Sequence, residues 1–395
     1  MPTRLQVAYQ LAPVFVQKVH HQNPRGDFIT SIDFTKPGDL TSLLDNWVAV
    51  NCLKEEGPKW NHKRWKRLLR NNERAPEFEH KLEPYIYYSV VETKYHYFVI
   101  YAAYHPQDWK PSNVTNRFES FEGPLWGANE HEHDMEGALV VARKKNRLED
   151  LRADIIITIS HWDFYSYAFW YLTDKLGKEI PVFSGVDEDI YKGAFENIDG
   201  KIWAAWHTDE GDVERMRPQL FVQAQGHGIK GDRKGWGRER RIIRYCPSLS
   251  ATDEPTIFRE GSPDPGVKLA YRTSPGRTSR EDRVVGKEVY RYKLIDIFKP
   301  NTNKYPARGL WESRNKRRLF RENDNGLKCF AVRKGGGLKA GSAKPPWSWD
   351  DETDVPTILP GWLATHPAEV VFYYGYHVGF DKFTHKYKSN RYQGI

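Results

Sequence analysis

The sequence contains few cysteines and no long apolar segment. Three cysteines occur in 395 residues, Cys52, Cys246 and Cys329, and no two of them are spaced as C-x-x-C. This odd and scattered set excludes a disulfide scaffold and a zinc ribbon, and it fits a reducing compartment. No run approaches the 18 uninterrupted apolar residues of a transmembrane helix, so we expect no transmembrane segment.

The N-terminal residues also lack the features of a cleavable signal peptide. Gln and Pro interrupt their apolar run, and no small-residue cleavage site follows. We therefore expect a cytoplasmic protein, or one exported without a cleavable signal peptide. The net charge of +8 is moderately basic. It fits an anionic membrane surface or nucleic acid as partner, and equally a basic protein with neither.

Aromatic residues are abundant, at 14% of the chain, and gather in strand-like runs. Residues 85–93 and 95–105 predict two strands joined by a short polar turn. Similar runs predict strands at 136–146, 153–161, 219–229, 241–247 and 288–298, and residues 165–177 suggest a short helix. The pattern predicts a mainly β protein, an antiparallel β-sandwich with helical and loop insertions. No clear boundary divides it, so we expect a single β-rich domain over 1–395.

Histidines and acids are concentrated in "NEHEHDME", residues 129–136, where a strand-like run begins. Residues two apart in a strand share a face, so Asp134 and Glu136 are expected to point the same way. His131 is close enough for a loop to bend it to the same point. Asp108, in the segment after the preceding strand, is well placed to complete the group.

This cluster has two interpretations. Carboxylates and an imidazole that converge are unfavourable without a cation, and mixed oxygen and nitrogen donors suit Mg²⁺, Ca²⁺ or Mn²⁺ better than structural Zn²⁺. The first interpretation is therefore a divalent-metal site formed by Asp108, His131, Asp134 and Glu136. The second is a solvated turn that is rich in charge.

Three motifs resemble the necrosis- and ethylene-inducing-peptide-like proteins, a family of cytolysins. They are "YFVIYAAYHPQDW", "HEHDMEGALVV" and "IIITISHWDFYSYA", and they occur in the family's order. More remotely, the His–Asp–x–Glu strand and the later "QGHG" are similar to vacuolar-sorting-62-like proteins. The motifs span about 85–230, a core onto which residues 280–395 are expected to pack as a C-terminal extension.

The resemblance implies a β-sandwich with a divalent ion at the second motif and binding to membrane sphingolipid headgroups. It implies that His131, Asp134, Glu136 and Asp108 are metal ligands and that His161 lines the same pocket. His227 corresponds to the Gly–Ser–His step of the remoter group. The sequence departs from the cytolysin pattern at Met135, where the family has Trp, and at Asn129 and Glu130, where it has Gly.

Three functions remain open. The first is a divalent-metal-dependent membrane or glycolipid-headgroup-binding protein, a toxin or effector of cytolysin-like fold, whose partner is an anionic or glycosylated lipid headgroup. The second is a metal-dependent phosphodiester hydrolase in which His227 or His161 is the catalytic base or acid and nucleic acid is the partner. The third is a non-catalytic interaction β-sandwich in which the cluster binds no metal.

Two further segments carry alternatives of the same kind. Residues 231–244 interleave Lys and Arg with Trp236, which suits nucleic acid or lipid phosphate but also a mobile basic loop. Residues 345–356, "PPWSWDDETDVP", place acids after two tryptophans. They are either a second cation site or an exposed acidic turn, and they lack the Gly and terminal Glu of an EF-hand loop.

Overall fold

The computed structural model describes 23 segments of secondary structure, and most of them are β-strands. The described residues are 2–19, 27–30, 84–108, 131–160, 163–168, 200–201, 203–208, 214–224, 226–231, 242–248, 268–271, 288–298, 320–322, 328–334, 337–340, 346–349, 359 and 361–395. The helices are α1 (Arg4–Leu11), α6 (Trp362–Thr365) and α7 (Pro367–Tyr373), with 3-10 turns η3 (Leu148–Asp150), η6 (Pro346–Ser348) and η7 (Tyr376–Gly379).

The strands follow one another along the chain in this order: β1 (Val14–Lys18), β2 (Tyr85–Thr93), β3 (His96–Asp108), β4 (His131–Arg143), β5 (Ile155–Ser160), β6 (Asp163–Ala168), β7 (Gly200–Lys201), β8 (Trp203–Thr208), β9 (Glu214–Val222), β10 (Ile229–Lys230), β11 (Ile242–Pro247), β12 (Lys268–Tyr271), β13 (Glu288–Asp296), β14 (Phe320–Glu322), β15 (Lys328–Lys334), β16 (Gly337–Ala340) and β17 (Tyr387–Ser389). The prediction of a mainly β protein is confirmed.

The sheet is mixed, which corrects the prediction of an antiparallel sandwich. One 14-stranded sheet runs in the order β12-β8-β9-β1-β11-β13-β2-β3-β4-β5-β6-β7, with β10 on β9 and β17 on β2. The pairs β1–β9, β11–β13, β13–β2 and β6–β7 are parallel. Residue alternation predicts that a strand has a buried face but does not encode its direction, so strands distant in sequence could not be oriented from their patterns.

The predicted helix at 165–177 is wrong where the structure describes it. Residues 163–168 form β6, which pairs with β5 from Ile155↔Ala168 to Ser160↔Asp163. Asp163 and Tyr165 are half-buried while Phe164 and Ser166 are buried. This alternation is that of a strand with one covered face, and pairing with β5 prevails over the helical tendency of the segment.

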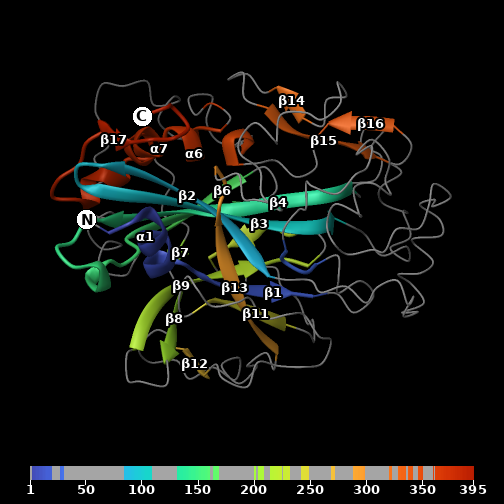
Figure 1. The fold of residues 1–395 in the computed structure, drawn as a ribbon, viewed down its shortest axis with the longest axis horizontal. Coiled ribbons are helices and arrows are strands. Elements are labelled where there is room, and N and C mark those ends of the chain that lie inside the picture. Colours follow the sequence, from blue (N-terminus) through green and yellow to red (C-terminus); the bar gives the residue numbers. More distant parts are fainter. Residues whose placement is uncertain are drawn as a thin grey trace.

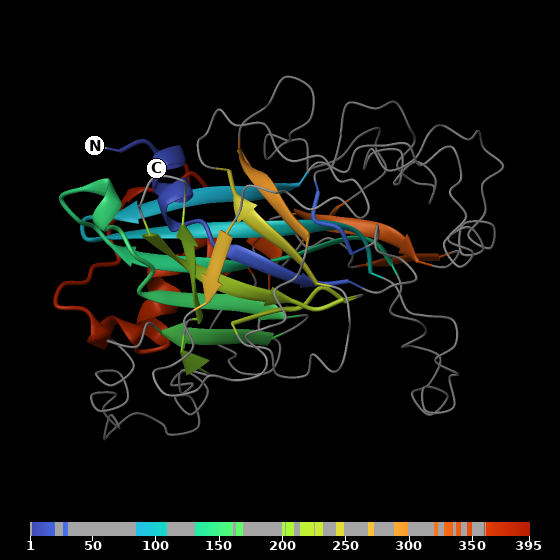
Figure 2. The same ribbon diagram turned by 90° about the horizontal axis from the view of Figure 1, so that it is seen from below.

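The sheet folds over so that one half packs on the other. In Figure 1, β2, β3 and β4 form a middle layer, with α1, β1, β9 and β11 below and α6, α7 and β17 above. β13 runs between the lower strands and the middle layer, because it pairs with β11 and with β2. Figure 2 shows the yellow and orange strands of the lower half crossing the green and cyan strands at an angle. The central strands are therefore covered on both faces, and their residues are buried along almost their whole length.

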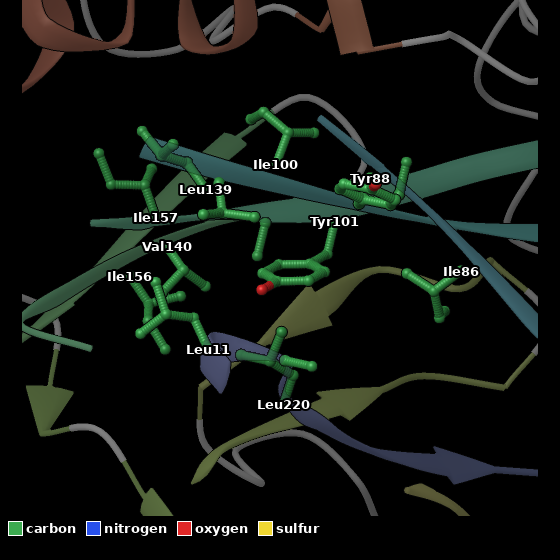
Figure 3. Close-up of a cluster of buried hydrophobic side chains, with 14 of the residues drawn as sticks. Leu11, Ile86, Tyr88, Ile100, Tyr101, Leu139, Val140, Ile156, Ile157 and Leu220 are labelled. Atoms are coloured by element: carbon green, nitrogen blue, oxygen red, sulfur yellow. The ribbon is translucent and has the colours of Figure 1, made fainter. Parts of the chain in front are cut away.

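The core between the two halves is built from alternate residues of the central strands. Tyr101, Val140 and Ile156 point towards Leu11 of α1 and Leu220 of β9 (Figure 3). The hydroxyl of Tyr101 donates a 2.6 Å hydrogen bond to the Ala8 carbonyl, so the one polar atom of this ring is satisfied in the core.

The opposite face of the same strands carries the C-terminal residues. Ile100, Leu139 and Ile157 are aligned partners in β3, β4 and β5 and point to this face (Figure 3). Ser89 of β2 shares a 2.7 Å hydrogen bond with the Tyr392 hydroxyl. In the part of the chain that the structure describes, no helix has the length and apolar character needed to span a membrane.

Candidate metal centre

The register of β3 and β4 places polar residues on the inner face of the sheet. His105 lies opposite Asp134, and Ala103 lies opposite Glu136. Residues directly opposite one another share a face, as do residues two apart along one strand. His105, Asp134 and Glu136 therefore project from the same face, and all three are buried.

A tight turn between β9 and β10 brings His227 to this face. Val222 pairs with Ile229, and Gln223 donates a backbone hydrogen bond of 3.0 Å to Gly228. A Cβ atom on Gly228 would lie 2.3 Å from the Ser160 hydroxyl oxygen, so only glycine fits against the end of β5. His227 has a φ of +52°, a left-handed conformation that histidine adopts more readily than most residues.

His227 links two carboxylates. Its Nδ1 lies 2.8 Å from Oδ2 of Asp134, and its Nε2 lies 3.1 Å from Oδ1 of Asp27. Burial alone would lower the pKa of His227, but hydrogen bonds to Asp134 and Asp27 and their charges outweigh it and raise this pKa to about 10. His227 is therefore an imidazolium at neutral pH, and both ring nitrogens donate to carboxylates.

His105 lies against His227 and has a different charge. Its Nε2 is 3.0 Å from Oε1 of Gln17, whose amide nitrogen donates to the carbonyls of Lys18 and Gln223. Gln17 must therefore accept at Oε1, so Nε2 of His105 carries the proton. Burial, with the nearby charge of His227, holds the pKa of His105 well below its usual range. His105 is a neutral imidazole.

These residues form a group that could hold a metal ion. Ligand atoms of His105, Asp134 and His227 all lie within 4.8 Å of one another. The donor set of two imidazoles and a carboxylate suits a divalent cation. Because both nitrogens of His227 already donate to carboxylates, however, His227 orients Asp134 in this arrangement, as the outer-shell partners of metal ligands do.

The predicted site residues are placed as follows. Asp134 and Glu136 share the inner face of β4, and His227 contacts Asp134. The backbones of Asp108 and His131 lie opposite each other where β3 ends and β4 begins. The side chains of Asp108 and His131 are outside the described part of the structure, and so is His161. The assignment of these residues as ligands or catalytic groups stays a prediction.

Three residues of the cluster were not found from the sequence. His105 stands in a predicted strand, but only the register with β4 shows that it faces Asp134. Gln17 and Asp27 precede His105, Asp134 and His227 by 78 residues or more, and no local spacing links them to those residues. The one available signal was the "AAYHPQDW" segment, in which His105 precedes the predicted ligand Asp108 by three residues.

No protein-family model matches the chain. No curated protein matches it either. Solved structures do match, and they are necrosis- and ethylene-inducing proteins.

One of them is necrosis- and ethylene-inducing protein 2 from the causal agent of cocoa's witches' broom disease. It shares 11% identity over 60% of this chain and 72% of its own, with a TM-score of 0.24. The non-toxic HaNLP3 protein shares 10% identity over 50% of this chain and 71% of its own, with a TM-score of 0.19. NLPPya, whose structure is in complex with glucosamine, shares 9% identity over 54% of this chain and 69% of its own, with a TM-score of 0.18.

These TM-scores are far below 0.5, so no residue position is transferred from these structures. The solved structures that match this chain are nevertheless those of the family whose motifs its sequence resembles.

Proposed function

We propose that this chain binds a divalent cation where β4 begins and, through it, the polar headgroup of a glycosylated lipid. Asp134 and Glu136 would bind the cation from the inner face of β4, with Asp108 and His131 as the further ligands that the sequence predicts. His227 would hold Asp134 from the other side. When bound, the cation would supply positive charge for the hydroxyl and anionic oxygens of a headgroup.

The observation that carries this proposal is the fixed position of Asp134. It is buried, it shares the inner face of β4 with Glu136, and one of its oxygens is bound to a protonated histidine. Burying acids at this density is unfavourable unless cations accompany them. His227 supplies one cation, and we propose a divalent ion as a second.

The geometry of His227 favours binding over phosphodiester hydrolysis. A general base at neutral pH must have a free lone pair that can reach the substrate. The His227 side chain is completely buried, and both ring nitrogens donate to carboxylates. The raised pKa keeps these protons in place at neutral pH.

A cation–aromatic pair that follows His227 along the chain supports a polar, anionic ligand. Lys230, three residues after His227, lies with its Nζ 4.2 Å from the ring centroid of Tyr165. Both side chains are half-buried. An ammonium held against an aromatic ring suits an anionic headgroup. The sequence resemblance suggests a glycosylated sphingolipid in particular.

Vesicle flotation tests this function. Phosphatidylcholine vesicles with and without a glycosylated sphingolipid are mixed with the protein, in Ca²⁺ or Mn²⁺ or in excess chelator. We expect cation-dependent flotation with glycolipid vesicles only, at least tenfold weaker in Asp134→Asn. Asp150→Asn, which changes an exposed acid of η3, is the matched control and should float as the wild type does.

Different results would contradict the role of the cation and the role of the headgroup. Flotation that is unchanged in chelator would contradict the role of the cation. Failure to float with any vesicle would contradict the headgroup. Hydrolysis of a phosphodiester that disappears in Asp134→Asn would support the hydrolase instead.

A further inference from the structure

The strand that carries the two acids is incompletely covered at its outer edge. β4 begins at His131, but among the described residues it pairs with β5 only from Ala138 to Val141. Asp134 and Glu136 precede this paired region. The edge of β4 that faces away from β3 must therefore be satisfied by something other than β5 along its first residues.

The carbonyl of Met135, between the two acids, points towards this edge. Tyr104 is the β3 partner of Met135, and the Tyr104 carbonyl accepts a 3.0 Å hydrogen bond from the backbone of Thr30. Tyr104 therefore directs its backbone groups away from β4. In an antiparallel ladder the opposite residue does the same, so the Met135 carbonyl points away from β3.

Trp349 takes the hydrogen-bonding place that β5 leaves. Its indole Nε1 donates to the Met135 carbonyl over 3.2 Å, and its side chain is completely buried. The ring also reaches Gly137, where its Cη2 would lie 2.5 Å from a Cβ atom. Trp349 thus spans the strand from Met135 to Gly137, directly behind Glu136.

The segment that carries Trp349 is itself anchored. The Trp349 carbonyl accepts a 2.6 Å hydrogen bond from the backbone of Gly361, just before α6. Gly361 has a φ of +84°, and a Cβ atom there would lie 2.2 Å from the Trp347 carbonyl oxygen. Only glycine permits this close approach, which fixes residues 346–349 against the C-terminal helices.

We propose that Trp349 is a positioning residue of the cation site, and that it fixes the backbone between Asp134 and Glu136. This inference rests on the proposed function for the divalent cation, whereas the hydrogen bond from Trp349 to Met135 is independent of that function. A hydrogen bond at the carbonyl between two ligands limits how far either carboxylate can move. Such outer-shell contacts typically change metal affinity 10- to 100-fold. In this role Trp349 gives a structural function to the "WSW" part of residues 345–356. The acidic residues that follow it in this segment lie outside the described residues.

Trp349→Phe tests the inference because it removes the indole N–H and keeps an aromatic ring. Trp347→Phe is the matched control: Trp347 is also buried and loses the same atoms, but its ring lies beside that of Tyr392. Two quantities are measured on the full chain, the affinity for Mn²⁺ by calorimetry and the exchange rate of the His227 ring N–H protons by NMR without metal.

We expect Trp349→Phe to bind Mn²⁺ about tenfold more weakly than Trp347→Phe and to exchange its His227 ring protons faster. Equal values in the two variants, for both quantities, would overturn the inference, because they would reflect a general loss of packing. If the wild type binds no Mn²⁺, the proposed function fails, and proton exchange alone decides the positioning role.

Discussion

The imidazole rings of His105 and His227 lie face to face, with ring centroids 3.8 Å apart and planes 1° from parallel. Two carboxylates overcome the effect of burial and raise the pKa of His227, whereas burial and the neighbouring imidazolium lower the pKa of His105. The pair is therefore a protonated ring stacked on a neutral one. Two protonated rings at this distance would repel, so the charge of His227 helps to keep His105 neutral.

Replacing His227 should strongly destabilise the fold. His227→Gln removes the charge that accompanies Asp134 and Asp27 and leaves both carboxylates buried. Removing one partner of a buried ion pair typically costs 3–5 kcal/mol, and we expect about that loss in urea unfolding. His385→Gln, at an exposed position, is the control and should change stability by less than about 0.5 kcal/mol. A similarly small loss of unfolding free energy in His227→Gln would mean that the ion pairs of His227 do not stabilise the fold.

Alkaline pH should also weaken the cluster. The folded-state pKa of His227, about 10, is above its ordinary value of 6.5. The stabilising contribution is therefore complete below about pH 6.5 and is lost as the pH rises to about 10. Thermal unfolding from pH 6.5 to 10 should show a falling Tm in the wild type. The same decrease in His227→Gln would assign it to other groups.

Acid should destabilise the protein through His96. This buried ring lies 4.4 Å from Phe380 and 5.3 Å from Phe383, centroid to centroid. Burial, with the charges of Arg143 and Lys144, lowers its pKa from 6.5 to about 4. The unfolded chain therefore binds a proton that the folded chain does not, and stability falls between pH 6.5 and 4, by roughly 3 kcal/mol for this residue.

The variant His96→Phe should remove this part of the acid sensitivity, because a phenyl ring suits the Phe380 and Phe383 surroundings. Urea unfolding at pH 7 and pH 4.5 measures the difference. His105 contributes in the same direction, so part of the dependence should remain. An unchanged pH dependence in His96→Phe would contradict this assignment.

Gly137 should not accept a side chain. A Cβ atom there would lie 2.0 Å from the Tyr101 carbonyl oxygen and 2.5 Å from the Trp349 ring. We expect Gly137→Ala to lower the free energy of unfolding by at least about 2 kcal/mol. Gly394→Ala is the comparison, because Gly394 has a φ of +77° and no described atom within 4 Å of the added Cβ. The Gly394→Ala substitution should lower the free energy of unfolding by about 1 kcal/mol, from backbone strain alone. An equal loss of unfolding free energy in the two variants would contradict this prediction, because it would mean that the neighbours of Gly137 move to make room for the methyl group.

The strands could be predicted where one short segment contains the whole signal. The runs at 85–93 and 95–105 could be predicted as β2 and β3 because each is rich in aromatic and β-branched residues, and the two strands pair across a turn of two residues. Strand direction could not be predicted in the same way. β13 lies parallel to both β11 and β2, and nothing in residues 288–298 indicates those neighbours.

The candidate site was predictable to the same extent. Asp134 and Glu136 share a face because they are two residues apart in one strand. Asp27 and His227 are 200 residues apart and meet only because the two halves of the sheet pack together. Trp349 likewise reaches Met135 from 214 residues away. Contacts of this kind depend on the tertiary fold, which residue spacing does not contain.

Titration of the metal-stripped protein with Ca²⁺, Mg²⁺ and Mn²⁺ by calorimetry tests the central claim most directly. The wild type should be compared with Asp134→Asn, which keeps the shape of the side chain, and with Asp150→Asn at the exposed position in η3. We expect saturable binding of at least one cation by the wild type and by Asp150→Asn, and its loss in Asp134→Asn. Absence of binding in the wild type, or equal binding by all three proteins, would contradict a cation site at Asp134.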